Sequence, residues 1–275
     1  FKIMKSNIIE TYDALERYNT SKCSYHQLMI FKPNQFIEQG DPLRGDNYSE
    51  LSNFVDTQHN FERSMEYLGL INNEFYEREI EKIKDISAAT LDLSQDFNEK
   101  ILPINAIFAQ FYQYLFIKEN IGNNHRILEI GPGSGYLSAM LAKDGYSLIT
   151  TDVTQALYIY QSLIFNKLKV LDEILYDSED FDETNAESYF SEKIKLKAGK
   201  ICHVPWWIFK ELYLAKDVSI DVIVMNHTTL EIHPKCLEYI IALAKKFKVK
   251  KFLMESTGNP GSQMKWKNVI KLFKD

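Results

Sequence analysis

The fold of this chain is decided by the stretch Ile127-Leu128-Glu129-Ile130-Gly131-Pro132-Gly133-Ser134-Gly135-Tyr136. Its first four residues form a short apolar run, interrupted by one acid, that is typical of a buried strand. The three glycines that follow at alternate positions let the backbone turn sharply and approach a ligand that any Cβ would hold away. A helix starting at the last glycine would present free N–H groups and the positive end of its dipole to that ligand. We therefore interpret the stretch as a strand, a ligand-binding loop and a helix.

The residues after this stretch alternate between short apolar runs and segments with helical spacing. We expect strands at 126–130, 147–151, 200–204, 221–226 and 251–255, and helices at 136–143, 154–168, 207–215, 234–247 and 265–273. This alternation predicts an α/β fold with a parallel, Rossmann-like sheet that is covered by helices on both faces. Between the second helix and the third strand, the acidic stretch Asp172–Glu192 predicts a solvated insertion.

Residues 1–103 lack this alternation, and we expect them to form a mainly helical region. Apolar residues recur at helical spacing over 61–84. Pro103 then opens a strongly apolar, aromatic helix that we expect at Ile104–Glu119. This helix is too apolar to stand free in water, so it should cover the cofactor edge of the sheet. The sequence thus predicts two parts, a lid or acceptor-binding region at 1–103 and a Rossmann-like domain at 104–275.

The composition argues against several kinds of partner. The formal net charge of −6 gives no positive field that would attract nucleic acid or an anionic membrane. No apolar run is long enough to span a membrane, and no charged-then-apolar leader opens the chain. Three scattered cysteines without a CxxC pair argue against a disulfide framework or a zinc site, and they favour a reducing, cytoplasmic setting. The sequence leaves the oligomeric state open.

The spacing of the glycines separates two kinds of cofactor-binding loop. In the nicotinamide and flavin fingerprint, GxGxxG, the third glycine would fall at the position of Tyr136. The third glycine is Gly135 instead, which gives the spacing GxGxG. This spacing, with the acid Glu129 before the turn, resembles motif I of the class I S-adenosylmethionine-dependent methyltransferases. The resemblance implies that Asp152, which lies 21 positions after Gly131 at the end of the second strand, binds the ribose hydroxyls.

Later segments resemble the sugar O-methyltransferases within that class. These segments are residues 151–157 (Thr-Asp-Val-Thr-Gln-Ala-Leu), 203–206 (His-Val-Pro-Trp) and 226–231 (Asn-His-Thr-Thr-Leu-Glu), and the resemblance as a whole covers 104–258. It implies that adenine packs near His203 and Val204 and that acceptor chemistry follows the fourth strand. The cofactor-binding residues that it implies are Glu129, Gly131, Pro132, Gly133, Gly135, Asp152, Val153, His203, Val204 and Asn226. Because neither NPPY nor DPPY follows the fourth strand, methylation of a nucleobase amino group is disfavoured.

Three residues near the ends of the last two strands are candidates for catalysis. His227 comes just after the fourth strand, at the carboxyl edge where open α/β sheets bind ligands. As a neutral imidazole it could take the proton of an acceptor hydroxyl, and Glu231 could orient its ring if a helical turn follows. A purely structural role for His227 fits the sequence equally well. Glu255, which ends the fifth strand, is a second candidate for binding the acceptor.

We therefore predict transfer of a methyl group from S-adenosylmethionine to an oxygen, with S-adenosylhomocysteine as product. The expected acceptor is a sugar hydroxyl of a surface-glycan precursor, and the alternative enzyme is a small-molecule or natural-product N- or O-methyltransferase. No dense cluster of Asp, Glu and Asn calls for a divalent ion, so we predict no metal. A complete class I sheet has seven strands, whereas this pattern ends after the fifth strand and its helix. Either the last two strands are missing from this chain or residues from elsewhere fill that edge, and a truncated end favours a non-catalytic protein that binds the cofactor or a partner. The intact glycine loop with Asp152 argues against that alternative.

Overall fold

The computed structural model describes residues 2–32, 44–51, 66, 69, 73–97, 104–174, 186–226, 228–255 and 264–274. Its helices are α1 (Lys2–Lys22), α2 (Tyr25–Phe31), α6 (Asn73–Phe97), α7 (Ile104–Ile121), α8 (Tyr136–Lys143), α9 (Gln155–Lys167), α10 (Ala186–Lys193), α11 (Trp206–Phe209), the 3-10 helix η1 (Leu212–Leu214), α12 (Pro234–Phe247) and α13 (Trp266–Lys274). Its strands are β1 (Arg126–Ile130), β2 (Ser147–Asp152), β3 (Leu171–Ile174), β4 (Ile201–Pro205), β5 (Val222–Asn226) and β6 (Lys251–Glu255).

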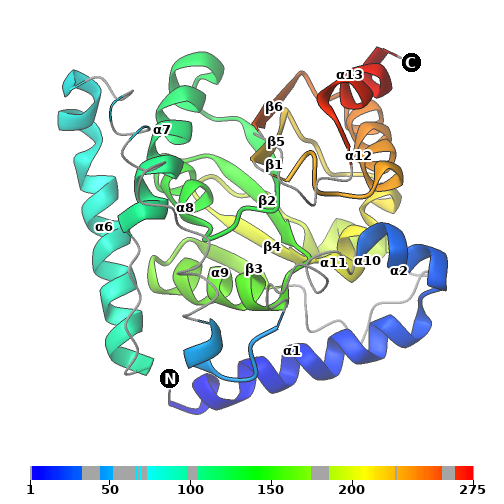
Figure 1. The fold of residues 1–275 in the computed structure, drawn as a ribbon, viewed down its shortest axis with the longest axis horizontal. Helices are drawn as coiled ribbons and strands as arrows, with labels where there is room; N and C mark the ends of the chain where they lie inside the picture. The colour runs from blue at the N-terminus through cyan, green and yellow to red at the C-terminus, as the bar shows by residue number, and fades with distance from the viewer. Residues whose placement is uncertain are drawn as a thin grey trace.

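The strands form a six-stranded sheet in the order β3-β4-β2-β1-β5-β6, with each neighbouring pair parallel (Figure 1). With the edge strand β3 set aside, the other five follow the order third, second, first, fourth, fifth, which is the Rossmann order. The direction of winding reverses between β1 and β5. Open α/β sheets bind ligands outside the carboxyl ends of the strands at such a switch point. The predicted Rossmann-like α/β fold is confirmed.

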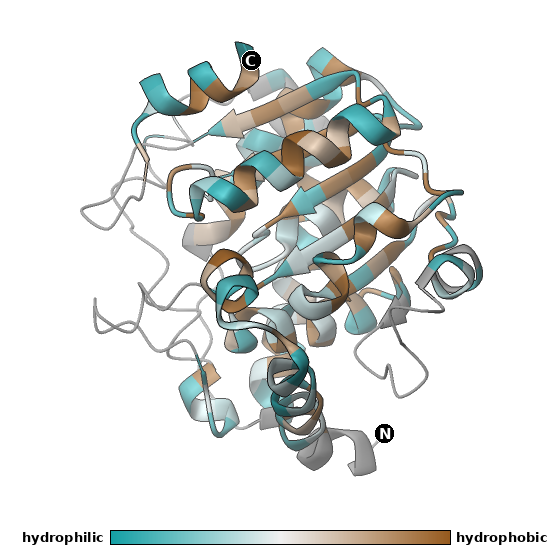
Figure 2. Ribbon diagram, turned by 90° about the vertical axis from the view of Figure 1, so that its right-hand side faces the viewer, coloured by the Kyte–Doolittle hydropathy of each residue, from teal (hydrophilic) through white to brown (hydrophobic). Residues whose placement is uncertain are grey.

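Helices cover both faces of this sheet. The chain leaves β1 through α8 and β2 through α9 toward one edge, and it leaves β5 through α12 toward the other edge. Right-handed crossovers therefore put α8 and α9 on one face and α12 on the opposite face. The side view shows α12 crossing in front of the strands (Figure 2). Strands β4 and β5 are buried along their whole length, which is why they are almost continuously apolar.

The described helices before residue 104 pack directly on the sheet domain. Helix α1 lies against α9 and α11, and α6 lies against α7, α8 and α9 (Figure 1). The buried side chains of Ile8, Tyr12, Ile86 and Leu93 belong to the same hydrophobic core as the strands. The helix expected at 61–84 lies partly outside the described residues, and α6 continues the helical spacing as far as Phe97. The aromatic helix expected to end at residue 119 is α7, which continues to Ile121.

The prediction that residues 172–192 form a solvated insertion was wrong at both ends. Leu171–Ile174 pairs with β4 as the edge strand β3, and Ala186–Lys193 forms α10. An edge strand pairs on one side only and can keep its charged side chains in water, so acidic residues are compatible with it. Oδ1 of Asp172, for example, accepts a hydrogen bond of 2.8 Å from Nζ of Lys197 at the surface. Residues 175–185 lie outside the described residues.

Two further expectations concern the second half of the chain, namely the helix at 207–215 and the strands at the end of the sheet. The helix expected at 207–215 is divided into α11 and η1. In the described part of the sequence, β6 is the edge strand next to β5, and α13 follows it. No described helix has the length and apolar character needed to cross a membrane.

Candidate functional site

The glycine loop lies at the carboxyl end of β1, at the switch point of the sheet. Gly131, Gly133 and Gly135 have φ angles of 67°, 60° and 78°, a region that residues with a Cβ rarely adopt. The N–H of Gly131 donates to the carbonyl of Thr151 at the end of β2 (2.9 Å), and the N–H of Gly135 donates to the carbonyl of Pro132 (3.0 Å). These two bonds hold the turn closed against β2.

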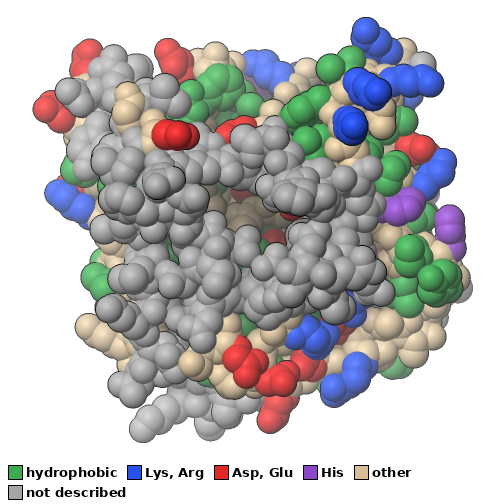
Figure 3. Space-filling view, in the orientation of Figure 1, with side chains coloured by type: hydrophobic (Ala, Val, Ile, Leu, Met, Phe, Trp, Pro, Cys, Tyr) green, Lys and Arg blue, Asp and Glu red, His purple; other side chains and the backbone are tan. Residues whose placement is uncertain are grey.

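The three glycines are needed for different reasons. A Cβ at Gly131 would overlap the side chain of Thr228, and a Cβ at Gly135 would lie 2.9 Å from the ring of Phe165. Among the described residues, a Cβ at Gly133 would meet nothing nearer than one side-chain nitrogen at 3.8 Å. Packing against the described residues therefore requires the first and third glycines but not Gly133. The space-filling view of this side of the molecule has a hollow near its middle, in which acidic side-chain atoms are visible (Figure 3).

Gln110 ties the loop to the aromatic helix α7. Its Nε2 donates to Oγ of Ser134 (2.8 Å) and to the carbonyl of Pro132 (3.4 Å), while its Oε1 accepts from the N–H of Leu137 (2.7 Å). Leu137 lies in the first turn of α8, whose N-cap, Gly135, has no side chain to satisfy the free N–H groups. Gln110 satisfies one of them. The expectation that the aromatic helix covers this edge of the sheet is thus confirmed.

Asp152 ends β2 and is buried close to the loop. The residue is only 5% exposed. Its Oδ1 accepts a hydrogen bond from the N–H of Thr154 (2.8 Å), and its Oδ2 accepts one from Nε2 of Gln161 (2.9 Å). Burial raises the pKa of Asp152 to about 6, although these hydrogen bonds oppose the rise. The hydroxyl of Thr154 and the N–H of Val153 act in the same direction as these hydrogen bonds, so donors of the protein itself hold this carboxylate in place.

Gln161 of α9 joins Asp152 to the glycine loop. Its Nε2 also donates to the carbonyl of Gly133 at 2.6 Å, so one amide group fixes the loop and the carboxylate relative to each other. The Oε1 of Gln161 is buried and has no hydrogen-bond partner among the described residues. An unsatisfied buried acceptor costs about 1–3 kcal/mol. Such an atom is therefore well suited to receive a hydrogen bond from a ligand.

Glu129 lies on β1, on the same face of the sheet as Asp152. Their common face follows from the register, since Glu129 pairs with Thr150 and side chains alternate along β2. The carboxylate of Glu129 accepts a hydrogen bond from the hydroxyl of Ser138 in α8. Burial raises the pKa of Glu129 to about 7, and the charge of Asp152 acts in the same direction. A cation bound near these two carboxyl groups would favour their ionised forms.

His203 is a core residue in the middle of β4. Its ring stacks on that of Tyr158, with centroids 3.9 Å apart, and its nitrogens contact Oγ1 of Thr150 (2.7 Å) and the carbonyl of Tyr158 (3.1 Å). Burial lowers the pKa of His203 to about 3, so the ring is neutral. Both nitrogens are used inside the protein, and the structure does not support the predicted contact of His203 with adenine. Val204 is buried on the opposite face, and Val153 is partly buried just after β2.

A second polar group lies at the carboxyl ends of β5 and β6. Asn226 and Glu255 are paired positions of these strands, and Gln113 of α7 bridges them. The Nε2 of Gln113 donates to Oε2 of Glu255 (2.9 Å), and its Oε1 accepts from Nδ2 of Asn226 (3.0 Å). The sequence predicted Asn226 and Glu255 but missed Gln113, as well as Gln110 and Gln161. The one available signal, for Gln110 and Gln113, was their spacing of three residues within the otherwise apolar stretch 106–117 of α7.

The predicted base, His227, lies outside the described residues, and its role stays a prediction. A turn does follow β5, because the N–H of Glu231 donates to the carbonyl of Thr228 (3.0 Å). His233 is the N-cap of α12, where its Nδ1 accepts a hydrogen bond from the N–H of Lys235 (3.1 Å). Within the described ranges, no group of three or more His, Cys, Asp or Glu could hold a metal ion. Metal independence likewise stays a prediction.

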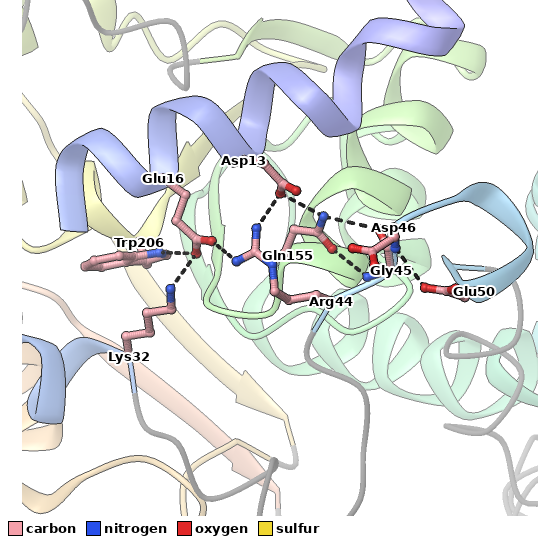
Figure 4. A network of polar contacts seen from close by, with 9 residues as sticks. All are labelled: Asp13, Glu16, Lys32, Arg44, Gly45, Asp46, Glu50, Gln155 and Trp206. Carbon is pink, nitrogen blue, oxygen red and sulfur yellow. Dashed lines mark hydrogen bonds and ion pairs between the residues drawn. The ribbon is translucent and has the colours of Figure 1, made fainter. Parts of the chain in front are cut away.

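An N-terminal network covers the β2 and β4 side of the same edge (Figure 4). Buried Glu16 of α1 accepts a hydrogen bond from Nε1 of Trp206 (3.0 Å) and pairs with Arg44. Arg44 also pairs with Asp13, which accepts a hydrogen bond from Nε2 of Gln155 (3.0 Å). Gln155 opens α9 shortly after β2, and Trp206 directly follows β4. Helix α1 is therefore anchored over the carboxyl ends of both strands.

Comparisons with known proteins leave the family of this chain open. No protein-family model and no curated protein matches it. Among solved structures, a mutant of a protein named MtNAS is 11% identical, over 82% of this chain and 79% of that chain. MtNAS in complex with MTA and tNA is 12% identical, over 88% of this chain and 77% of that chain. The TM-score is 0.34 in both cases, which is too low to support an inference about this chain.

Proposed function

We propose that the chain binds S-adenosylmethionine at the loop Gly131–Gly135 and transfers its methyl group to an oxygen. The observation that carries this proposal is the backbone at Gly133, which has a positive φ at the switch point of the sheet and where a Cβ would come no closer than 3.8 Å to any described atom. A glycine in such a position suits a ligand that passes close to the backbone. The GxGxG spacing with Glu129 before it, which resembles motif I, supports this particular cofactor over a dinucleotide.

The residues around the loop suit different parts of this cofactor. Asp152 would accept hydrogen bonds from the ribose hydroxyls, and the unpartnered Oε1 of Gln161 offers a further acceptor beside it. The buried carboxyl groups of Glu129 and Asp152 suit a positively charged sulfonium, because a nearby cation favours their ionised forms. Pro132 would shape the turn with the glycines, and Val153 would line the ribose side.

Bound at this loop, S-adenosylmethionine supplies an electrophilic methyl group on a sulfonium. The acceptor hydroxyl must be held in line with that methyl group and must lose its proton. We assign proton removal to His227, orientation of its imidazole to Glu231 and binding of the acceptor to Glu255. The acceptor in this proposal is a sugar hydroxyl of a surface-glycan precursor, the product is S-adenosylhomocysteine, and the reaction is cytoplasmic and independent of metal.

Binding and transfer are tested by separate experiments. Calorimetry with S-adenosylhomocysteine tests binding, and labelled S-adenosylmethionine offered with a panel of methyl glycosides tests transfer. Methylation of other small molecules, but of no glycoside, would favour the alternative N- or O-methyltransferase. Binding without any transfer would favour a non-catalytic protein. The proposal is refuted if the parent protein binds S-adenosylhomocysteine no better than a Gly133→Asp variant does.

A further inference from the structure

We propose that Gln113 is a positioning residue, which turns the carbonyl oxygen of Asn226 toward the acceptor so that this oxygen binds an acceptor hydroxyl. The inference rests on the proposed function, because it concerns the acceptor of the same site. It starts from the bridge at the carboxyl ends of β5 and β6, where Gln113 of α7 is hydrogen-bonded to Asn226 (3.0 Å) and to Glu255 (2.9 Å).

The direction of these hydrogen bonds is set by Glu255. An ionised carboxylate can only accept hydrogen bonds, so Gln113 must turn its NH2 group toward Glu255. The Oε1 of Gln113 then faces Asn226, which has to donate with Nδ2. The Oδ1 of Asn226 is consequently turned away from Gln113. The charge at the end of β6 thus fixes the orientation of an amide at the end of β5 through a side chain of α7.

This carbonyl oxygen is buried but lacks a partner. Asn226 is 8% exposed, and its Oδ1 has no hydrogen bond to any described residue. Buried amide oxygens nearly always accept a hydrogen bond, because burial removes their hydrogen bonds to water and an unpartnered oxygen does not replace them. The backbone of Asn226 lies next to the start of the glycine loop, since Oγ1 of Thr228 is within hydrogen-bond distance of the backbone carbonyl oxygens of Asn226 (2.9 Å) and Ile130 (3.2 Å). A donor group of a ligand at the switch point would satisfy Oδ1 of Asn226.

The pair of acceptors indicates the chemical class of that ligand. An amide oxygen and a carboxylate lie side by side at the ends of two neighbouring strands, at Asn226 and Glu255. A vicinal diol of a pyranose brings two hydroxyl donors on one rigid ring, whereas a phenol brings only one. The site therefore fits a polyol acceptor.

Exchanging the charges of residues 113 and 255 tests the relay, by which we mean that Glu255 orients the amide of Asn226 through Gln113. Gln113→Glu sets a second carboxylate against Glu255, and Glu255→Gln removes the charge that orients Gln113. Each single variant should raise the KM for a methyl glycoside by about tenfold or more. In the double variant, Gln113→Glu with Glu255→Gln, the carboxylate on α7 again accepts from Nδ2 of Asn226, so the carbonyl keeps its orientation. Its KM should return to within about threefold of the parent value.

The readouts separate acceptor binding from cofactor binding. The probes are the methyl α-D-glycosides of glucose, galactose and mannose, and the affinity for S-adenosylhomocysteine should stay within about twofold of the parent value in every variant. Glu119→Gln, which removes an exposed charge from the same helix, is the control and should change neither quantity. If Gln113→Glu fails to fold, Asn226→Ser removes the side-chain amide with its carbonyl and should still raise KM.

Each remaining outcome has one meaning. A double variant no better than the two single variants overturns the relay, as does an unchanged KM in Asn226→Ser. A loss of S-adenosylhomocysteine affinity in Asn226→Ser overturns it too, and returns this residue to the cofactor site that the sequence predicted. If the parent binds S-adenosylhomocysteine but methylates none of the three glycosides, the polyol class is wrong. If the parent binds no S-adenosylhomocysteine, the proposed function itself has failed.

Discussion

Replacing the loop glycines by alanine, one at a time, should separate the glycine that a ligand requires from the two that packing requires. A left-handed backbone costs an alanine about 1–2 kcal/mol at each position. At Gly135 the added Cβ would also lie 2.9 Å from Phe165, and at Gly131 it would overlap Thr228. Such overpacking adds about 1–3 kcal/mol. At Gly133 only the backbone cost applies, because the nearest described atom is 3.8 Å from the added Cβ.

Stability and cofactor affinity should therefore rank the variants differently. Gly133→Ala should lower the free energy of unfolding by about 1–2 kcal/mol, and Gly131→Ala and Gly135→Ala should lower it by about 2–5 kcal/mol. Thermal unfolding should show the smaller loss as a shift of about 2–8 °C. In calorimetry, Gly133→Ala should bind S-adenosylhomocysteine at least about tenfold more weakly, a loss of about 1.4 kcal/mol, because its methyl group would occupy the space proposed for the ligand.

The matched control for the packing argument combines Gly131→Ala with Thr228→Ala. The second substitution removes the side-chain atoms that the new Cβ would overlap, so the double variant should recover part of the lost stability. Two results would refute the reasoning. One is a Gly133→Ala variant that binds S-adenosylhomocysteine as tightly as the parent, since the space beside Gly133 would then not hold the ligand. The other is a Gly133→Ala variant that is the least stable of the three.

Four further outcomes are expected. Asp152→Asn should weaken S-adenosylhomocysteine binding by roughly 10–100-fold without lowering the melting temperature at neutral pH. The pKa of about 6 means that ionising this carboxyl group destabilises the folded state from about pH 4 up to about pH 6 and no further above that. In the parent, calorimetric affinity should fall as the pH drops through about 6, because Asp152 becomes protonated and loses an acceptor, and this dependence should be absent from Asp152→Asn. His227→Ala should lower kcat by roughly 10²–10⁴-fold with unchanged S-adenosylhomocysteine affinity, and retention of more than about a third of turnover would make this histidine structural. Exhaustive chelation should leave turnover intact, and activity that is lost and then restored by magnesium or manganese would contradict metal independence.

The parts of the fold that depend on local pattern could be predicted from the sequence. Strands β1 and β6 and helices α8 and α12 have the expected bounds, because each is a marked apolar run or an amphipathic segment between turn residues. Strand β3 was missed because Leu171–Ile174 is short, half acidic and at the edge of the sheet. Nothing in its own residues distinguishes it from a solvated loop. Its pairing with β4 is a property of the tertiary structure.

Of the candidate site, the sequence could predict only the glycine loop and Asp152, because their spacing forms a recognisable motif. The glycines and Asp152 follow one another at a spacing that the chemistry requires, and they do lie together at the switch point. The family resemblance implied that adenine packs near His203, but β4 continues to Pro205, and the ring of His203 is stacked on Tyr158 of α9. Glutamines within helices are common surface residues, so only the packing of α7 and α9 shows which of them face the loop.

The buried carboxyl groups beside the loop are held by neutral partners, and this choice has a consequence for the ligand. Glu129 accepts a hydrogen bond from Ser138, and the side-chain donors to Asp152 are Gln161 and Thr154. A lysine or arginine in either place would orient the carboxyl group equally well, but it would also cancel its charge and lower its pKa. A hydroxyl or an amide orients the carboxyl group without cancelling its charge. Burial can therefore raise the pKa of Glu129 to about 7 and that of Asp152 to about 6. In the function that we propose, the compensating positive charge comes from the sulfonium of the substrate and disappears when the methyl group leaves. The same neutral partners would then favour binding of the methyl donor over its product.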